Sequence, residues 1–433
     1  MPYSKEKTLI FKKAIASSMV SKVVSMVFQV ISVPLLLSFL GAEGFGLYST
    51  LVALFGWVFL ISGGINPGIT RIVARGGINA ISQRFINTAK KINITLISFV
   101  IIIFAIFYLF SDSPTFYLFS YHHVFTMLLF CLPIIYYSLT DSIRQGMGEQ
   151  HYNNLWASLA TFISIIFIYL LSFSEFSTEL AIHIVIFAIY FPILVSKLLN
   201  TFYLKRNKTV NLINYNLGKR KQTFRLYKVL TFITLSNLLI QLSVIVNKSV
   251  VMVTMANFSL IDTAKLELVF RFFMLAGTFF ATIQQPLWPM ITQAIKSKNN
   301  TWVEKIRNKL FVSFLFYSFI LMICVVLFGE LAFKVWSNGE FHFSELELSL
   351  MSIYFITIAL NQACIVMLMG YGVFTFIGKA LIIESIVLVF LIYSNLFDSS
   401  IAGIMVAMIV ARISTSSIIL FLGVKRRDFH NAK

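Results

Sequence analysis

Long apolar stretches follow one another along nearly the whole chain, and they limit its fold more than any other feature of the sequence. About 20 predominantly apolar residues cross a bilayer as a helix. Only 12% of the 433 residues are charged, against about 25% in soluble domains. The sequence therefore predicts an all-α polytopic membrane protein with about twelve transmembrane helices. The predicted spans are residues 14–40, 46–65, 92–110, 123–141, 153–172, 180–203, 229–256, 265–292, 310–334, 347–370, 378–397 and 400–423.

The charges between these spans predict which side of the membrane each loop occupies. If the N-terminus is cytoplasmic, the inner loops and tails hold 28 of the 35 lysines and arginines, and the outer loops hold 11 of the 17 acidic residues. Short cytoplasmic loops are enriched in lysine and arginine, so we expect an even number of spans with both termini in the cytoplasm. Loop cations beside an anionic leaflet also account for the net charge of +18. No nucleic-acid motif accompanies them, and we expect no nucleic-acid binding.

The chain divides into two halves of six predicted spans, residues 1–216 and 217–433, at the long basic loop 205–228. The second span of each half ends in Pro-x-Ile-Thr, at residues 67–70 and 289–292. Because six is an even number, the halves insert in the same orientation, related by an axis along the membrane normal. This pattern predicts two six-helix bundles around a central cavity that opens alternately to the two sides.

The segment 237–298 carries a cation in each of two consecutive spans, Lys248 in the seventh and Arg271 in the eighth, joined by a hinge at residues 257–264. A charge inside hydrocarbon costs about 2.5–3.5 kcal/mol, so such residues usually face a cavity. The eighth span ends in QQPLWPM, and two prolines three residues apart are expected to break the helix there. We interpret this paired-helix unit as part of a transport path.

The charges within the predicted spans favour an anionic substrate, because they comprise five cations and one clear anion, Glu384. The planar guanidinium of an arginine suits phosphate, which it contacts in a bidentate manner. The residues that we predict to bind substrate are Arg271, Arg412, Lys248 and Lys22.

Other roles remain open for three of these cations. Lys248 and Lys22 lie near the ends of their spans, where a lysine extends its ammonium group toward the membrane surface. Arg412 lies near the middle of the last span, where its alternative is a structural pair with Glu384. The fifth cation, Lys197, lies near the inner end of its span and is expected to reach the surface in the same way.

Three motifs resemble those of the O-antigen flippases (Wzx) of the multidrug/oligosaccharidyl-lipid/polysaccharide exporter superfamily. They are FLGAEGFGLYSTL at residues 39–51, GGINPGITRIVARG at residues 63–76 and QQPLWPMITQAIKSKNNTWVEKI at residues 284–306. The resemblance covers essentially the whole chain. It implies a flippase that moves undecaprenyl-pyrophosphate-linked oligosaccharide units across the bacterial inner membrane, from the cytoplasmic to the periplasmic leaflet, for lipopolysaccharide biosynthesis. The partners that it implies, besides membrane lipid, are an O-antigen polymerase and a chain-length regulator.

One position departs from the pattern of that family. Many relatives carry an acidic residue in the middle of the seventh span, where this chain has Asn247 and Lys248. Mechanisms that couple transport to a cation through that carboxylate are therefore not expected here.

Two other function classes compete with the flippase. A drug exporter of the same superfamily that binds cationic drugs is expected to use acidic cavity residues, whereas cations dominate these spans. A polyprenyl-dependent glycosyltransferase or polymerase needs clustered carboxylates or a large catalytic loop, and the one candidate pair is Glu345 and Glu347. The three cysteines lie in apolar runs and no phosphate-binding P-loop is present. We therefore expect a transporter that is not an enzyme, with no metal or other cofactor.

Overall fold

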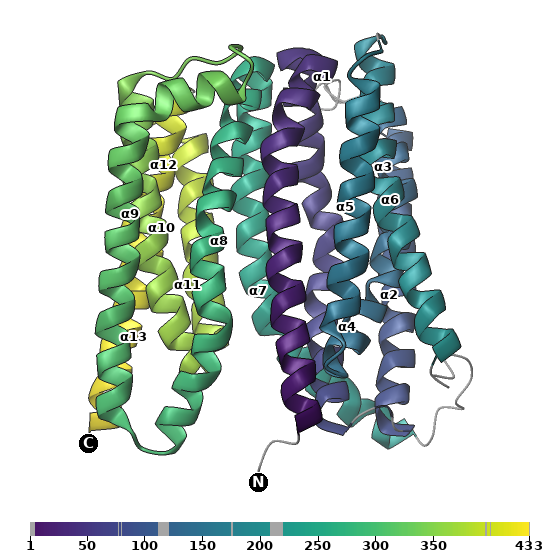
Figure 1. Cartoon of the computed structure of the whole chain (residues 1–433), viewed down its shortest axis with the longest axis vertical. Coiled ribbons are helices and arrows are strands. Elements are labelled where there is room, and N and C mark those ends of the chain that lie inside the picture. Colours follow the sequence, from purple (N-terminus) through teal and green to yellow (C-terminus); the bar gives the residue numbers. More distant parts are fainter. Residues whose placement is uncertain are drawn as a thin grey trace. The chain divides into compact units, whose positions relative to one another are not determined.

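In the residues that it describes, the computed structural model of the chain consists mainly of long helices (Figure 1). It describes residues 5–76, 78, 80–110, 121–174, 176–207, 220–394, 396–398 and 400–432, and these ranges contain no strand. The helices in chain order are α1 (Lys5–Gly76), α2 (Ala80–Phe110), α3 (Tyr121–Tyr137), α4 (Leu139–Gly146), α5 (Gln150–Leu171), α6 (Thr178–Asn207), α7 (Arg220–Phe258), α8 (Leu260–Lys296), α9 (Asn300–Trp336), α10 (Glu345–Gly370), α11 (Phe374–Tyr393), α12 (Ile401–Arg412), the π-helix η2 (Ile413–Ser417) and α13 (Ile418–Ala432).

Eleven helical stretches in the described part of the chain are long and apolar enough to cross a membrane. The first, Val20–Leu60, spans 41 residues and contains a break at Gly41, whose φ of 68° and ψ of 173° are not helical. The predicted spans 14–40 and 46–65 are therefore the two arms of α1. The prediction of an all-α polytopic membrane protein is confirmed, and the helices agree with twelve spans in two bundles.

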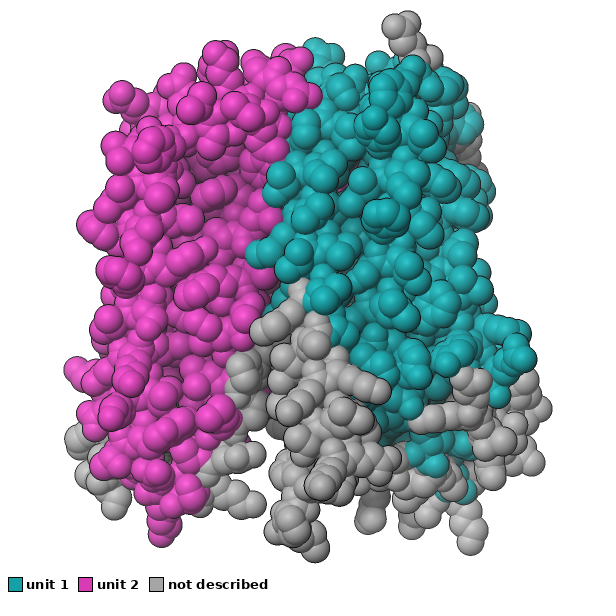
Figure 2. Space-filling view, in the orientation of Figure 1, with its two compact units in different colours: residues 1–44, 54–238 teal, residues 45–53, 239–433 magenta. Residues whose placement is uncertain are grey.

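The helices form two compact units (Figure 2). Unit 1 comprises Met1–Gly44 and Leu54–Leu238, and unit 2 comprises Phe45–Ala53 and Leu239–Lys433. The predicted boundary between the halves, at residues 216 and 217, lies outside the described residues. Within each unit the long helices run alongside one another (Figure 1).

Glycine allows one close helix contact inside unit 2. A Cβ atom on Gly46 of α1 would lie 2.0 Å from the carbonyl oxygen of Leu260, at the start of α8. No other residue type fits at this distance, so the second glycine of the GFG sequence brings the two backbones together.

The Pro-x-Ile-Thr repeat of the sequence makes the same contact in both units. In unit 1 the Thr70 hydroxyl contacts the carbonyl oxygens of Asn66 and Ser142, each at 3.2 Å. In unit 2 the Thr292 hydroxyl contacts the carbonyl oxygens of Trp288 and Gly370, at 3.1 and 2.8 Å. Each threonine therefore joins its own helix to the end of a second helix, α4 or α10.

The two contacted helices also end in the same glycine turn. The turn glycines Gly148 and Gly372 have φ angles of 79° and 74°. The preceding glycines pack closely, because a Cβ on Gly146 would lie 2.7 Å from the Cβ of Val73, and one on Gly370 would lie 2.7 Å from the Cβ of Ile291. A threonine contact and a glycine turn thus recur in the two units, although Val73 and Ile291 do not occupy corresponding positions of the repeat.

Candidate functional site

Charged and amide side chains within the spans of unit 2 form two neighbouring groups. The first, here the hairpin cluster, consists of Lys248, Glu267 and Arg271. The second, here the glutamate network, consists of Asn247, Asn361, Glu384, Arg412 and Ser416. Because Asn247 and Lys248 are consecutive residues of α7, this helix contributes to both groups.

The hairpin cluster lies on two helices that are joined by a very short turn. Ser259 alone separates α7 from α8, and its hydroxyl accepts a hydrogen bond from the backbone N–H of Asp262 at 3.1 Å. This cap starts α8 at Leu260, whereas the sequence analysis predicted a hinge over residues 257–264. Glu267 consequently lies inside the candidate span Leu260–Gln284. It also lies within the predicted span 265–292, so the prediction that Glu384 is the one clear anion of the spans was wrong.

The predicted break at the end of the eighth span is likewise not found. α8 continues through the QQPLWPM sequence to Lys296. Membrane helices tolerate proline when neighbouring groups satisfy the backbone atoms that it frees.

Glu267 binds both cations of the hairpin cluster. Its Oε2 atom lies 2.9 Å from the Lys248 ammonium nitrogen, and its Oε1 atom lies 3.2 Å from Nε of Arg271. The Glu267 side chain is 7% exposed, while Lys248 is 28% and Arg271 is 14% exposed. One buried carboxylate thus neutralises one of two cations, and the cluster retains a net charge of +1.

Aromatic rings cover the two cations from other sides. The Lys248 ammonium lies 5.7 Å from the ring centre of Phe270, and the Arg271 guanidinium lies 5.4 Å from that of Phe45. Cations at such distances are attracted to the face of an aromatic ring. The rings stabilise the positive charge without neutralising it.

The structure therefore brings Lys248 and Arg271 together, but around the carboxylate of Glu267, which was not counted among the charges of the predicted spans. Oppositely charged residues four apart are neighbours on one face of a helix. The spacing of Glu267 and Arg271 was thus a signal for the pair. Binding of substrate by Lys248 and Arg271 stays a prediction.

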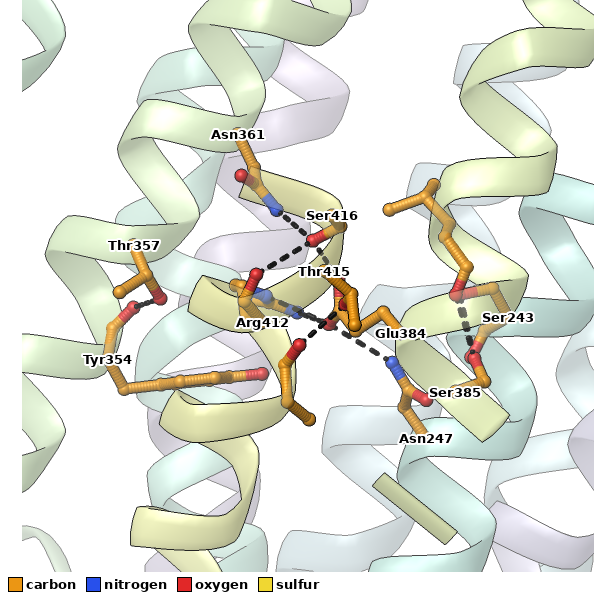
Figure 3. Close-up of polar contacts among 12 residues, drawn as sticks. Ser243, Asn247, Tyr354, Thr357, Asn361, Glu384, Ser385, Arg412, Thr415 and Ser416 are labelled. Atoms are coloured by element: carbon orange, nitrogen blue, oxygen red, sulfur yellow. Dashed lines mark hydrogen bonds and ion pairs between the residues drawn. The ribbon is translucent and has the colours of Figure 1, made fainter. Parts of the chain in front are cut away.

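In the glutamate network, Arg412 and Glu384 point toward one another (Figure 3). The Arg412 atoms Nε and Nη2 donate to Oε1 of Glu384 at 2.9 and 2.8 Å. Ser416 donates to Oε2 of the same carboxylate, and Asn247 approaches Oε1 at 3.4 Å. Glu384 is 2% exposed, so four donors from three residues surround a buried carboxylate. The structural pair that the sequence left open as the alternative for Arg412 is present.

A π-helical turn positions two of the polar side chains in this network. η2 follows Arg412 directly and carries Ser416 and Ser417. Asn361 of α10 donates to the Ser416 hydroxyl at 2.7 Å and accepts from the Ser417 hydroxyl at 2.8 Å. π-helical turns inside α-helices occur frequently at functional sites. Sequence reasoning missed this turn, although the run STSS within an apolar span was a signal for it.

Tyr354 completes the surroundings of Arg412, since the guanidinium carbon lies 4.6 Å from the centre of its ring (Figure 3). Arg412 is thus held by a carboxylate and by an aromatic face. Its charge is balanced by Glu384.

The remaining predicted residues lie elsewhere. Lys22 is a half-buried residue of α1 in unit 1. Lys197, which was expected to extend its ammonium group to the membrane surface, forms an ion pair with Asp141 of α4. Binding of substrate by Lys22 and Arg412 stays a prediction.

Glu345 and Glu347, the candidate catalytic pair, lie in the first turn of α10. Ser344 and Glu347 form a capping box there, in which the Glu347 carboxylate accepts a hydrogen bond from the Ser344 backbone N–H at 2.8 Å. Both Glu347 oxygens also lie 2.9 Å from the ammonium nitrogen of Lys265. These contacts give Glu347 a structural role at a helix start.

The chain is similar to known proteins in sequence family and in fold. The family model described as "Polysaccharide biosynthesis protein" matches residues 11–295. Comparison with curated proteins gives no match.

Among solved structures, the inward-facing conformation of a multidrug resistance MATE family transporter of the MOP superfamily has a TM-score of 0.74 at 13% identity, covering 94% of this chain and 95% of that chain. The outward-facing conformation of a MATE family transporter of this superfamily has a TM-score of 0.65 at 14% identity, covering 98% and 96%.

A MOP superfamily transporter from Pyrococcus furiosus, described as having a binding pocket of reverse polarity that suggests a different function, has a TM-score of 0.59 at 16% identity and covers 98% and 95%. At such identities the likeness shows the fold. The chain has the fold of MOP superfamily transporters.

Proposed function

This chain belongs to the polysaccharide biosynthesis protein family, the family of Wzx-type flippases, and from that premise we propose that it is an O-antigen flippase. Its substrate is then an undecaprenyl-pyrophosphate-linked oligosaccharide, moved from the cytoplasmic to the periplasmic leaflet of the bacterial inner membrane. The two bundles open alternately to the two sides, and both termini lie in the cytoplasm.

The net positive charge of the hairpin cluster is the observation that carries the choice of substrate. Lys248 and Arg271 share the carboxylate of Glu267, so these three residues together carry two positive charges and one negative charge within the spans. A charge in this position is costly unless it is paired or faces water. A pyrophosphate head group is an anion that matches it, and the arginine suits its oxygens.

The same cluster is suited to weak, reversible binding of an anion. A phosphate oxygen that approaches Lys248 and Arg271 competes with the carboxylate of Glu267, which already forms ion pairs with both cations. The binding free energy is therefore the difference between two ion-pair arrangements and stays small. Weak binding favours release of the substrate on the periplasmic side.

Arg412 and Lys22 have secondary places in this scheme. Arg412 contacts substrate only when its ion pair with Glu384 breaks. We therefore assign it a structural role first, in which it holds α11 and the last span together. Lys22 lies in the cytoplasmic third of its predicted span, where it suits the first encounter with the anionic head group.

A second candidate function is export of cationic drugs, and the buried carboxylates Glu267 and Glu384 favour it. Each carboxylate is, however, already paired with cations of the protein. A cationic drug would have to displace an arginine or a lysine that is covalently held at the site. The flippase is therefore the better interpretation.

Deletion of the gene tests the proposal. Loss of a flippase removes long surface polysaccharide, while single lipid-linked oligosaccharide units accumulate on the cytoplasmic leaflet. A drug exporter would instead leave the polysaccharide ladder intact and raise drug accumulation in the cell. A normal ladder in a null strain that has no second flippase would contradict the assignment, and restoration of the ladder by the gene on a plasmid is the control.

A further inference from the structure

An apolar groove of about 500 Å³ lies in unit 2 where the end of α10, the start of α11 and the helix α13 come together. Leu368 and Phe376 form one wall, and Ile419 and Leu422 form the other. Arg426 is the charged residue among those that line it. The groove thus combines several apolar side chains with the cation of Arg426.

The sequence of α13 produces this shape. Gly423 has no side chain, and a Cβ there would lie 2.4 Å from Cε1 of Phe376, so the ring of Phe376 rests on the helix backbone. Leu422 and Arg426 are four residues apart and lie on one face of the helix. The apolar wall therefore passes into the positive charge within one helical turn.

The surroundings of the groove are basic. Residues 366–383 and 413–426, which include the lining residues, contain Lys379, Lys425 and Arg426 and no acidic residue. Arg427 and Asp428 follow Arg426 directly, and the nearby Glu384 is bound to Arg412. No ion pair involves Arg426 among the residues that the structure describes. The positive end of the groove is therefore available to an anion.

We propose that this groove binds a membrane phospholipid with an anionic head group, with one acyl chain on the apolar wall and the phosphate at Arg426. Basic pockets between transmembrane helices on the cytoplasmic side bind anionic head groups. The predicted topology places the turn between α10 and α11, and the C-terminus, on that side. A single arginine matches the single charge of a phosphodiester rather than a pyrophosphate. This lipid site is independent of the flippase function.

Native mass spectrometry of the full chain in detergent tests the site, with phosphatidylglycerol, phosphatidylcholine and undecaprenyl phosphate added separately and in competition. We expect phosphatidylglycerol to bind about fivefold better than phosphatidylcholine, the factor expected for one basic residue at a membrane surface. Arg426→Gln should abolish this preference. Lys425→Gln is the matched control, because it removes the same charge from the next residue, which does not line the groove, and it should keep the preference.

A second variant tests the apolar wall. Ile419→Trp fills the groove and should reduce the binding of both phospholipids, while the melting temperature of the protein shows that it remains folded. Equal losses in Arg426→Gln and Lys425→Gln would overturn the site in favour of general surface attraction. Displacement of phosphatidylglycerol by an equal concentration of undecaprenyl phosphate would also overturn it, since the groove would then belong to the carrier lipid.

Discussion

The guanidinium of Arg412 donates two hydrogen bonds to a single oxygen of Glu384, at 2.9 and 2.8 Å. Both residues lie inside candidate spans, and the carboxylate is 2% exposed. Removal of one partner from a buried ion pair leaves an uncompensated charge and destabilises a protein by about 3–5 kcal/mol. The pair therefore affects stability in addition to any role in transport.

Substitution of this pair separates the two roles. Arg412→Ala should lower the melting temperature and the yield of folded protein, because Glu384 loses its counter-charge. The double variant Arg412→Met with Glu384→Gln removes both charges and should restore stability. If Arg412 also binds substrate, this folded double variant still gives a shortened polysaccharide ladder. A ladder of normal length would show that the arginine has a structural role only.

The hairpin cluster gives a prediction about Arg271. Arg271→Ala should reduce translocation in reconstituted vesicles about tenfold or more, because a hydrogen bond to a charged group contributes about 1.5–3 kcal/mol. Arg271→Lys should restore the rate in part, since lysine keeps the charge but not the planar fork. The fraction of labelled lipid-linked oligosaccharide accessible outside the vesicle measures the rate. Normal rates in the alanine variant would contradict the role of this arginine in substrate binding.

Glu267→Gln should have a different effect in the same cluster. The change leaves Lys248 and Arg271 without their carboxylate, so a pyrophosphate no longer competes with it. We expect more lipid-linked oligosaccharide to copurify with the variant and translocation to become slower, because release is impaired. The comparison variant is Glu347→Gln, whose carboxylate pairs with Lys265 outside this cluster. Less copurified substrate in Glu267→Gln than in the native protein would refute the competition.

The repeated glycine contacts predict matched losses of stability in the two units. Gly146→Ala and Gly370→Ala each place a methyl group less than 3 Å from Val73 or Ile291. Overpacking of this kind costs about 1–3 kcal/mol, so both variants should melt at lower temperature. Gly277→Ala is the control in α8, since nothing lies within 4 Å of its added methyl group. A fall of the melting temperature in Gly277→Ala alone would contradict this interpretation.

The number and orientation of the spans predict the result of reporter fusions. A reporter that is active only in the periplasm should work when it is fused near Asn338, in the turn after α9, and should be silent near Asn211. Asn211 lies in the predicted loop between the two halves, outside the described residues. Activity at Asn211 would refute both the span count and the cytoplasmic position of that loop.

The fold class could be predicted from the sequence, because the hydrophobic length of a span and the charge of a loop are properties of whole segments. The membrane-spanning helices and the repeat at Thr70 and Thr292 followed from such patterns. The break at Gly41 was indicated only by the gap between the predicted spans 14–40 and 46–65. Glu267 was not counted among the anions of the spans because it lies near the start of the predicted span 265–292. The short cap at Ser259 starts α8 at Leu260 and so places Glu267 further inside the helix.

The glutamate network depends on contacts between helices that are distant in sequence. Asn361, Glu384 and Ser416 come from α10, α11 and η2. Periodicity within one helix does not reveal which polar residue of another helix it meets. The pairing of Arg412 with Glu384 was therefore one of two alternatives, and it needed the packing of three helices to be identified.

The balance of charge in these clusters leads to a prediction about the driving force. The cell interior is negative, so an anion that moves outward is driven by the membrane potential. Each net charge that crosses contributes about 2.3 kcal/mol per 100 mV, and the two charges of a pyrophosphate contribute about 4–5 kcal/mol. Asn247 and Lys248 stand where a coupling carboxylate was expected from the resemblance, and both contact carboxylates of other helices.

Transport in vesicles should therefore respond to an imposed potential when no pH or sodium gradient exists. A potassium gradient with an ionophore sets the potential, and reversal of the gradient should reverse the effect on the translocation rate. If Lys248 and Arg271 move with the head group as counter-charge, less net charge crosses the membrane and the response is shallower. Arg271→Lys keeps the charge and should keep the steepness, whereas Arg271→Ala should make the response of its residual transport steeper. Equal rates at all potentials would exclude the electrical mechanism, while the flippase assignment would stand on the gene deletion.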